Sequence, residues 1–305
     1  MEHRTSHKVA IIGAGVSGMT CALYLARANI DVCLIGDWTT TLLLSTPEIK
    51  NYPGIPSISG YDFLNNLHNQ VAEYNIPIIE GMALTPMIKD DQWIILTEPG
   101  DVVDTENLVI ATGSEPRLLG LENEEHLIGH GVSTCAYCDA QAFAGKSVVV
   151  VGSGNLAIEE AIYLSKICSK VTVLCRKNEF STQDYTAERL IDHKNVGVNF
   201  NAEVMKIERT DSGFMILLKG LRTRMISADG IFYAIGSVPN TTFLNGVFPL
   251  DKNKYIDLPE EVSTTHRMYA CGDVNATNKY KQVVTAAADG CNTAIRIIRD
   301  IRQHR

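Results

Sequence analysis

Apolar and polar residues follow one another in the same order in two separate parts of the chain. Residues 8–35 (KVAIIGAGVSGMTCALYLARANIDVCLI) contain an apolar run, a glycine turn, a run with helical periodicity and a second apolar run. Residues 146–174 (KSVVVVGSGNLAIEEAIYLSKICSKVTVL) repeat this order. An apolar strand that leads through a glycine turn into a helix and back to a strand is typical of a βαβ unit. The pattern therefore predicts an α/β fold with parallel strands.

Each block carries a glycine fingerprint between its first strand and its helix. The two are GxGxxG (Gly13, Gly15 and Gly18) and GxGxxA (Gly152, Gly154 and Ala157). In such a fingerprint the first glycine permits the tight turn, the second lets a pyrophosphate approach, and the third position keeps helix and strand close. An ordinary glycine turn is the alternative, but the flanking strand and helix favour nucleotide binding. We expect two Rossmann-like, three-layer dinucleotide-binding domains.

Two other apolar runs that end in glycine turns indicate where the chain passes between these domains. They are VIATGSEP at 109–116 and GIFYAIGSVPN at 230–240. We therefore expect the second domain, residues 117–240, to be inserted into the first, which comprises residues 1–116 and 241–305. A further glycine signal, YACGDV at 269–274, falls in the returning part of the first domain.

Composition and charge restrict the partners. The chain has 305 residues, of which 45% are hydrophobic and 20% charged, as in a globular protein of two domains. Its formal charge of -8 and its scattered Lys and Arg argue against nucleic acid. The polar N-terminus does not resemble a secretory signal, and no apolar run is long enough for a membrane span. Eight cysteines without such a signal fit a reducing compartment, so we expect a cytoplasmic protein.

The segment GVSTCAYCDAQ, residues 131–141, places Cys135 and Cys138 close together and follows them with Asp139. The pair could belong to a zinc site, a static clamp or a redox couple. Zinc needs four ligands, and no second pair follows at the spacing of zinc modules. A clamp across two residues would constrain little chain and stabilise little. A redox couple fits a chain that also carries two nucleotide fingerprints.

The ordered set GxGxxG, NYPG, ATG, CxxCD, GxGxxA, IGxxPN and GDV resembles the low-molecular-weight thioredoxin reductases over essentially the whole chain. The resemblance implies a homodimer with FAD on the first domain and NADPH on the second. It also implies that Cys138 exchanges electrons with the flavin, that Cys135 attacks the substrate disulfide, and that Asp139 protonates the departing thiolate of thioredoxin.

The resemblance further implies the residues of both cofactor sites. For FAD they are Gly13, Gly15, Ser17, Gly18, Asp37, Asn51, Thr112, Gly113, Gly272, Asp273, Lys281, Gln282 and Val283. For NADPH they are Gly152, Gly154, Asn155, Ala157, Arg176 and Lys177. Asp273 is expected at a helix N-terminus, where its carboxylate would accept hydrogen bonds from ribityl hydroxyls; the alternative is an N-cap that serves only the helix.

Two segments depart from the family pattern. CRKNEFS, residues 175–181, replaces HRRxxxR, whose arginines hold the 2′-phosphate of NADPH. Arg176 is retained, Lys177 lacks the planar fork of arginine, and Ser181 carries no charge. TTLL, residues 40–43, replaces a GGQL-like flavin loop. NADPH is the expected donor, with NADH and reduced ferredoxin as alternatives.

The predicted function is that of an FAD-dependent thioredoxin-disulfide reductase. A dithiol oxidase of the same fold, which passes electrons to oxygen, is an alternative enzyme. A flavin-binding redox sensor that signals through a partner and barely turns over is an alternative of a different class. Steady-state turnover with thioredoxin separates the three.

Overall fold

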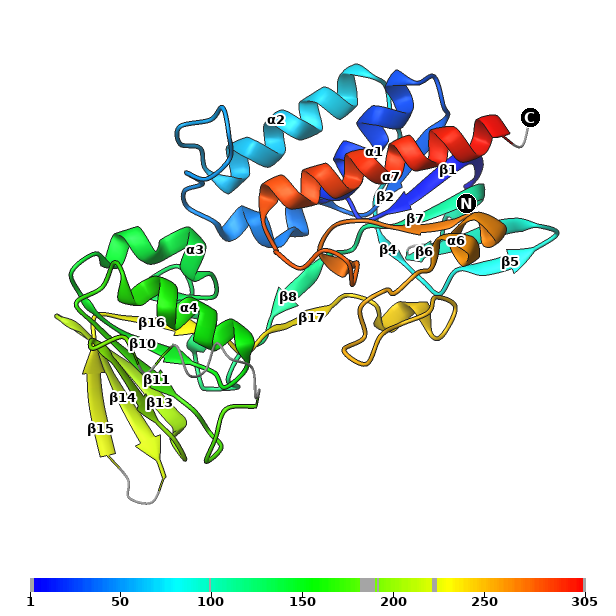
Figure 1. Cartoon of the computed structure of the whole chain (residues 1–305). Coiled ribbons are helices and arrows are strands. Elements are labelled where there is room, and N and C mark those ends of the chain that lie inside the picture. The colour runs from blue at the N-terminus through cyan, green and yellow to red at the C-terminus, as the bar shows by residue number, and fades with distance from the viewer. Residues whose placement is uncertain (1–2, 99, 182–189, 191, 221–223, 304–305) are drawn as a thin grey trace. The chain divides into compact units, whose positions relative to one another are not determined.

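The computed structural model describes residues 3–98, 100–181, 190, 192–220 and 224–303, and the chain divides into two compact units (Figure 1). Unit 1 joins Met1–Glu115 to Val238–Arg305, and unit 2 is Pro116–Ser237. The chain crosses between the units in β8 (Ser114–Pro116) and β17 (Ser237–Pro239), which pair with each other. The second crossing therefore begins slightly before the position expected from the sequence.

Asn240 explains the position of that crossing. Its backbone N–H donates to the Gly113 carbonyl (3.0 Å) and its side-chain amide to the Thr112 carbonyl (3.1 Å), while Thr112 Oγ1 donates to the Asn240 carbonyl (2.7 Å). These three bonds attach the residue after β17 to unit 1. Two residues expected at the FAD site, Thr112 and Gly113, therefore also join the outgoing and returning chain.

Unit 1 is built on a sheet with the strand order β3-β2-β1-β7-β6-β4, in which β18 also pairs with β7 and β5 with β6. Its strands are β1 (Arg4–Ile12), β2 (Val32–Ile35), β3 (Ile78–Ile79), β4 (Met82–Ala83), β5 (Met87–Lys89), β6 (Gln92–Glu98), β7 (Val102–Ile110) and β18 (Met268–Ala270). β1 pairs in parallel with both β2 and β7. Its helices are α1 (Val16–Arg27), α2 (Gly60–Glu73), α6 (Glu260–His266) and α7 (Val283–Gln303).

The side chains of β1 point alternately into two hydrophobic cores. Val9 and Ile11 pack in the core formed with α1, α2 and α7. Ala10 and Ile12 belong to the other core, which contains Trp93. Successive side chains of a strand point to opposite faces, so a strand that is apolar throughout is buried on both. This explains why residues 9–12 form a continuous apolar run.

Unit 2 has a five-stranded parallel sheet in the order β12-β11-β10-β16-β9 and a three-stranded antiparallel sheet, β13-β14-β15. The parallel strands are β9 (Val132–Ser133), β10 (Ser147–Val151), β11 (Lys170–Leu174), β12 (Val196–Asn199) and β16 (Gly230–Tyr233). The antiparallel strands are β13 (Glu203–Thr210), β14 (Gly213–Lys219) and β15 (Arg224–Ala228). Its described helices are α3 (Ala136–Asp139) and α4 (Asn155–Ser165).

The parallel sheet of unit 2 lies between the helices and the antiparallel sheet. Val148 and Val150 pack against α3 and α4, whereas Val149 and Val151 face Phe214 and its neighbours on the antiparallel sheet. The α/β fold with parallel sheets predicted from the sequence is confirmed. None of the described helices combines the length and apolar character that crossing a membrane requires.

Candidate active site

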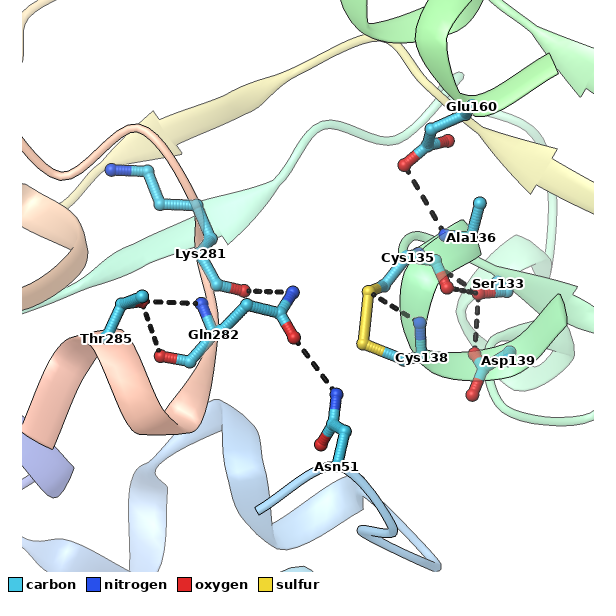
Figure 2. The surroundings of a disulfide bond; sticks show 10 residues. All are labelled: Asn51, Ser133, Cys135, Ala136, Cys138, Asp139, Glu160, Lys281, Gln282 and Thr285. Atoms are coloured by element: carbon cyan, nitrogen blue, oxygen red, sulfur yellow. Dashed lines mark hydrogen bonds between the residues drawn. A yellow bond between two sulfur atoms is a disulfide. The ribbon is translucent and has the colours of Figure 1, made fainter. Parts of the chain in front are cut away.

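Cys135 and Cys138 form a disulfide at the start of α3, directly after the edge strand β9 (Figure 2). Cys135 is the N-cap of α3, and its Sγ accepts the backbone N–H of Cys138 at 3.2 Å. Such a donor at the start of a helix favours the thiolate over the thiol. The local geometry therefore favours Cys135 as the ionised sulfur of the reduced pair. Cys138 is the more exposed residue of the two.

Ser133, which the sequence analysis did not single out, connects this pair to Asp139. Its Oγ lies 2.6 Å from Asp139 Oδ2 and 3.2 Å from the Cys135 carbonyl oxygen, and it accepts the Cys135 N–H at 3.0 Å. The hydroxyl group thus orients an exposed carboxyl group next to the disulfide. An exposed acid held in place in this way can deliver a proton to a leaving group.

Glu160 on α4 is the second residue that the sequence analysis missed. Its side chain points toward α3, where Oε1 accepts the backbone N–H of Ala136 at 3.4 Å (Figure 2). The residue is 3% exposed, and Oε2 has no hydrogen-bond partner among the described residues. Burial raises the pKa of this carboxyl group to about 7, and nearby Glu159 acts in the same direction.

The first fingerprint forms a tight turn between β1 and α1. Gly13 has a φ of +116°, and a Cβ there would lie 2.3 Å from the Ala111 carbonyl oxygen. A Cβ on Gly18 would lie 1.9 Å from the Gly13 carbonyl oxygen, so the helix packs directly on the turn. A Cβ on Gly15 would meet only Thr41 Cγ2, at 3.9 Å. This is the open position at which a phosphate can approach the backbone.

The second fingerprint repeats this arrangement between β10 and α4. A Cβ on Gly152 would lie 2.4 Å from the Ala234 carbonyl oxygen, and a Cβ on Gly154 would meet nothing within 4 Å. Asn155 begins α4, and the Ala157 Cβ closes on Gly152. Arg176 and Lys177 follow β11 and are exposed to solvent.

Ser181 contacts this second turn directly. Its backbone N–H donates to the Ser153 carbonyl (2.7 Å), and the two hydroxyl groups are 2.9 Å apart. The residue in the position of the last arginine of HRRxxxR therefore connects to the glycine turn instead of offering a charge. Leu156, on the first turn of α4, is exposed.

The turn that contains Gly272 and Asp273 is rich in partly buried polar groups. Asp273 lies in a short 3-10 turn (Gly272–Val274), and its Oδ1 accepts from the Asn278 side-chain amide at 3.2 Å. Burial raises the pKa of Asp273 to about 6, and Lys281 opposes this shift. Asp273 was expected at a helix N-terminus, and the helix in which it lies is this 3-10 turn, whereas α7 begins only at Val283. The intervening residues form hydrogen-bonded turns rather than helix.

Lys281 and Asp289 complete this cluster. Lys281 Nζ donates to the Asp273 carbonyl oxygen (2.7 Å), and burial lowers the pKa of the ammonium group. Asp289 on α7 accepts the Gly272 N–H at 2.7 Å, and burial raises its pKa. Asp289 was not predicted, because nothing in the local sequence of α7 indicates that it reaches back to the GD turn.

The remaining residues expected around FAD fall into two groups. Asn51 and Gln282 meet although they are far apart in the sequence, with Asn51 Nδ2 donating to Gln282 Oε1 at 3.0 Å (Figure 2). Ser17 lies against the GD turn, since a Cβ on Gly272 would be 2.3 Å from its Oγ. Asp37, in contrast, uses its carboxylate locally to accept from the backbone N–H and the hydroxyl group of Thr39.

Comparison with known proteins identifies the family. The model of the family described as pyridine nucleotide-disulphide oxidoreductase matches residues 7–290. The chain belongs to this family. It is 33% identical over 302 residues to a thioredoxin reductase of Rickettsia typhi, covering 95% of this chain and 96% of the relative. It is 34% identical over 309 residues to one of Buchnera aphidicola subsp. Baizongia pistaciae, covering 95% and 93%.

Solved structures agree with this assignment. A thioredoxin reductase from Streptococcus pyogenes superposes with a TM-score of 0.87 at 28% identity, covering 98% of this chain and 99% of that one. One from Giardia duodenalis gives a TM-score of 0.89 at 28% identity, covering 97% and 99%. The resemblance inferred from the ordered motifs and the α/β fold with two dinucleotide-binding domains are both confirmed for this pyridine nucleotide-disulphide oxidoreductase.

Proposed function

We propose that this member of the family is an FAD-dependent thioredoxin-disulfide reductase. The observation that carries the proposal is the Cys135–Cys138 disulfide, with a backbone donor on Cys135 Sγ and an acid, Asp139, oriented by Ser133. Relatives named thioredoxin reductase match nearly the full length of the chain and support the choice of substrate. A dithiol oxidase and a redox sensor are not favoured by these relatives.

The chain's residues carry out the disulfide exchange in two steps. Reduction of the pair by two electrons and two protons leaves Cys135 as the nucleophile. Its thiolate attacks one sulfur of the substrate disulfide, which forms a mixed disulfide and releases the other sulfur as a thiolate that Asp139 protonates. The Cys138 thiol then loses its proton and attacks the Cys135 sulfur, so the Cys135–Cys138 disulfide forms again. The second substrate sulfur leaves as a thiolate and takes up that proton. The substrate gains the two electrons and two protons that the pair loses.

The residues of unit 1 fit FAD. The open backbone at Gly15 suits a pyrophosphate, and the partly buried carboxyl group of Asp273 suits a ribityl hydroxyl. The Asn51–Gln282 pair and the backbone at Val283 would lie at the ring. When bound, FAD would supply the electron pair that reduces the disulfide.

NADPH is the proposed donor, and its site would be the second fingerprint. Gly154 leaves space for the pyrophosphate, and Arg176 and Lys177 offer two exposed cations for a 2′-phosphate. Ser181 offers none because it bonds to Ser153. NADH and reduced ferredoxin are therefore tested beside NADPH. From the resemblance we also propose a cytoplasmic homodimer.

An anaerobic donor screen tests the proposal. The purified FAD-loaded protein is mixed with NADPH, NADH or reduced ferredoxin, and the visible absorption band of the flavin is followed. Bleaching by NADPH, followed by reoxidation on addition of oxidised thioredoxin, is the expected result. Bleaching by ferredoxin alone would overturn the donor, and a reduced enzyme that thioredoxin fails to reoxidise would overturn the substrate.

A further inference from the structure

Glu160 is a buried carboxyl group that the exchange mechanism above does not use. It lies on the face of α4 that also carries Ala157, Ala161 and Leu164, all of which are buried. An apolar residue would suit this face better, because a buried carboxyl group with an unpaired oxygen is costly. The cost is small only while the group keeps its proton, which agrees with a pKa of about 7.

The carboxyl group bonds to the same turn that holds the nucleophile. Oε1 accepts the Ala136 N–H, and Cys135 Sγ accepts the Cys138 N–H, so two acceptors share the first turn of α3. The Ala136 nitrogen follows Cys135 directly, and bond lengths then limit the separation between Oε1 and Cys135 Sγ to roughly 8 Å or less. In a partly buried site, two negative charges this close change each other's ionisation equilibrium by a factor of about ten.

Within the part of the chain that the structure describes, few other charges lie near this pair of groups. Glu159 is the neighbouring charge that raises the pKa of Glu160. Among the described residues, the titratable side chains on the elements that pack against α4 are Tyr137, Cys138 and Asp139 on α3 and Lys170 on β11, whereas β10 and β12 carry none. His193 also contacts the last residue of α4, because its Nδ1 lies 2.9 Å from Ser165 Oγ. The ring of Tyr163, on α4 itself, packs against that of Tyr137 at a tilt. The thiols of Cys168 and Cys175 in the same core are kept neutral by burial, which raises the pKa of both.

We propose that Glu160 is a positioning residue for Cys135: it holds the turn through the Ala136 N–H and keeps its proton while the Cys135 thiolate is present. An ionised Glu160 opposes formation of the thiolate, and a thiolate opposes ionisation of Glu160, so the two groups titrate as a coupled pair. The inference rests on the proposed function only in taking Cys135 as the nucleophile. It makes Glu160 the group that sets the pH range in which the reduced enzyme is reactive.

The test measures ionisation of Cys135 directly. The measurement uses the Cys138→Ser variant, in which Cys135 cannot form its disulfide. The full-length FAD-loaded protein is first treated with a phosphine reductant. The rate of carboxamidomethylation of Cys135 by iodoacetamide is then followed against pH by peptide mass spectrometry. With Glu160 present, the profile should show two coupled ionisations.

Glu160→Gln should convert this profile into a single ionisation. The amide keeps an oxygen acceptor for the Ala136 N–H and removes the negative charge. At pH values near the pKa of Glu160 and just above it, Cys135 should react with iodoacetamide about three- to tenfold faster in Glu160→Gln than in the parent. Glu159→Gln is the matched control, because it removes an exposed carboxylate from the adjacent position of the same helix. Its pH profile should still show two ionisations. Superposable profiles for the parent and Glu160→Gln would overturn the inference.

A measurement on the unaltered protein covers the case in which Glu160→Gln does not fold. The infrared difference spectrum between the disulfide and the phosphine-reduced dithiol, taken near pH 7, should gain the C=O stretch of a protonated carboxyl group. Asp139→Asn should retain this band. Loss of the band in Asp139→Asn, or its absence from the parent, would overturn the inference. Neither experiment uses thioredoxin or a nicotinamide, so the proposed function can fail while this result stands.

Discussion

The two glycine turns have the same backbone design and different surroundings. In each turn a Cβ on the first glycine would strike a carbonyl oxygen of a neighbouring strand end, while the second glycine faces open space. Around the first turn, the GD segment adds partly buried titratable groups, Asp273, Lys281 and Asp289. Around the second, the cations Arg176 and Lys177 are exposed. Buried polar groups suit a ligand that stays bound, and exposed cations suit one that exchanges.

The difference extends to the helix that follows each turn. The residues of α1 that face the core are small or apolar, whereas α4 buries Glu160 in the corresponding layer and directs it to the CxxC turn. The motif therefore specifies only how a dinucleotide phosphate can approach. Under the proposed function, the side chains around it would distinguish a turn that holds a resident cofactor from one that serves redox exchange.

Replacing Cys138 by serine should break the exchange chemistry of unit 2 and leave unit 1 intact. The mixed disulfide could no longer be resolved, so steady-state thioredoxin reduction should fall by at least about a thousandfold. FAD content and bleaching by the nucleotide should be unchanged, and the buried Cys168→Ser serves as the control. Retained turnover would contradict the assigned roles of the two sulfurs.

Substitution of the first glycine in each turn should separate the two nucleotide sites. Gly13→Ala places a Cβ against backbone at a φ of +116°, and we expect a loss of about 2–4 kcal/mol of unfolding free energy together with loss of FAD. Gly152→Ala should cost a similar amount and abolish bleaching by the nucleotide while FAD is retained. Urea unfolding and the flavin-to-protein absorbance ratio measure these effects.

Gly54→Ala is a matched control for this experiment, because Gly54 also has a positive φ but a Cβ there would meet nothing within 4 Å. It should show backbone strain without the steric clash. If Gly152→Ala lost FAD as readily as Gly13→Ala, the assignment of one cofactor to each turn would be wrong.

The buried carboxyl groups should give the two units different pH dependences of stability. The folded pKa of Glu160 is about 7 against an ordinary value of 4.5, so the folded state binds the extra proton between these values. The contribution of protonated Glu160 to the free energy of unfolding is fully present below about pH 4.5 and is lost as the pH rises to about 7, by about 3 kcal/mol at 1.36 kcal/mol for each pH unit. Glu160→Gln should remove this fall, as urea unfolding across the range would show.

Asp273→Asn provides the comparison in unit 1. The pKa of Asp273 is about 6 in the folded state against an ordinary value of 3.8. Its contribution to the free energy of unfolding is therefore lost between about pH 3.8 and about pH 6, a lower range than for Glu160. If Glu160→Gln and Asp273→Asn changed the free energy of unfolding over the same pH range, neither carboxyl group would be the source of the pH dependence assigned to it.

The smallest expected effect concerns the choice of nucleotide. Ser181→Arg should restore a third cation beside Arg176 and Lys177, at the cost of the contact between the Ser153 and Ser181 hydroxyls. We expect the preference for NADPH over NADH, measured as the ratio of kcat/KM values, to rise about fivefold. Ser181→Ala removes the same hydroxyl contact without adding charge and should leave the ratio unchanged. An equal change in both variants would assign the effect to the turn and not to the charge.

The sequence by itself determined the parts of this protein that depend on local backbone. The apolar runs of β1 and β10, the glycine turns and the spacing of Cys135, Cys138 and Asp139 are properties of neighbouring residues, so they can be recognised without a fold. The helical periodicity of α4 also contained the signal for Glu160, because position 160 shares a face with 157, 161 and 164.

Only the tertiary structure decided which side chains meet. Asn51 reaches Gln282, Asp289 reaches Gly272, and Glu160 reaches Ala136 across long stretches of chain. The antiparallel sheet β13-β14-β15 and the turns between Asp273 and α7 were likewise not predicted. The physical reason is the same in each case: burial and hydrogen-bond partners are set by packing between distant elements, and these change the pKa of a carboxyl group far more than its neighbours in sequence do.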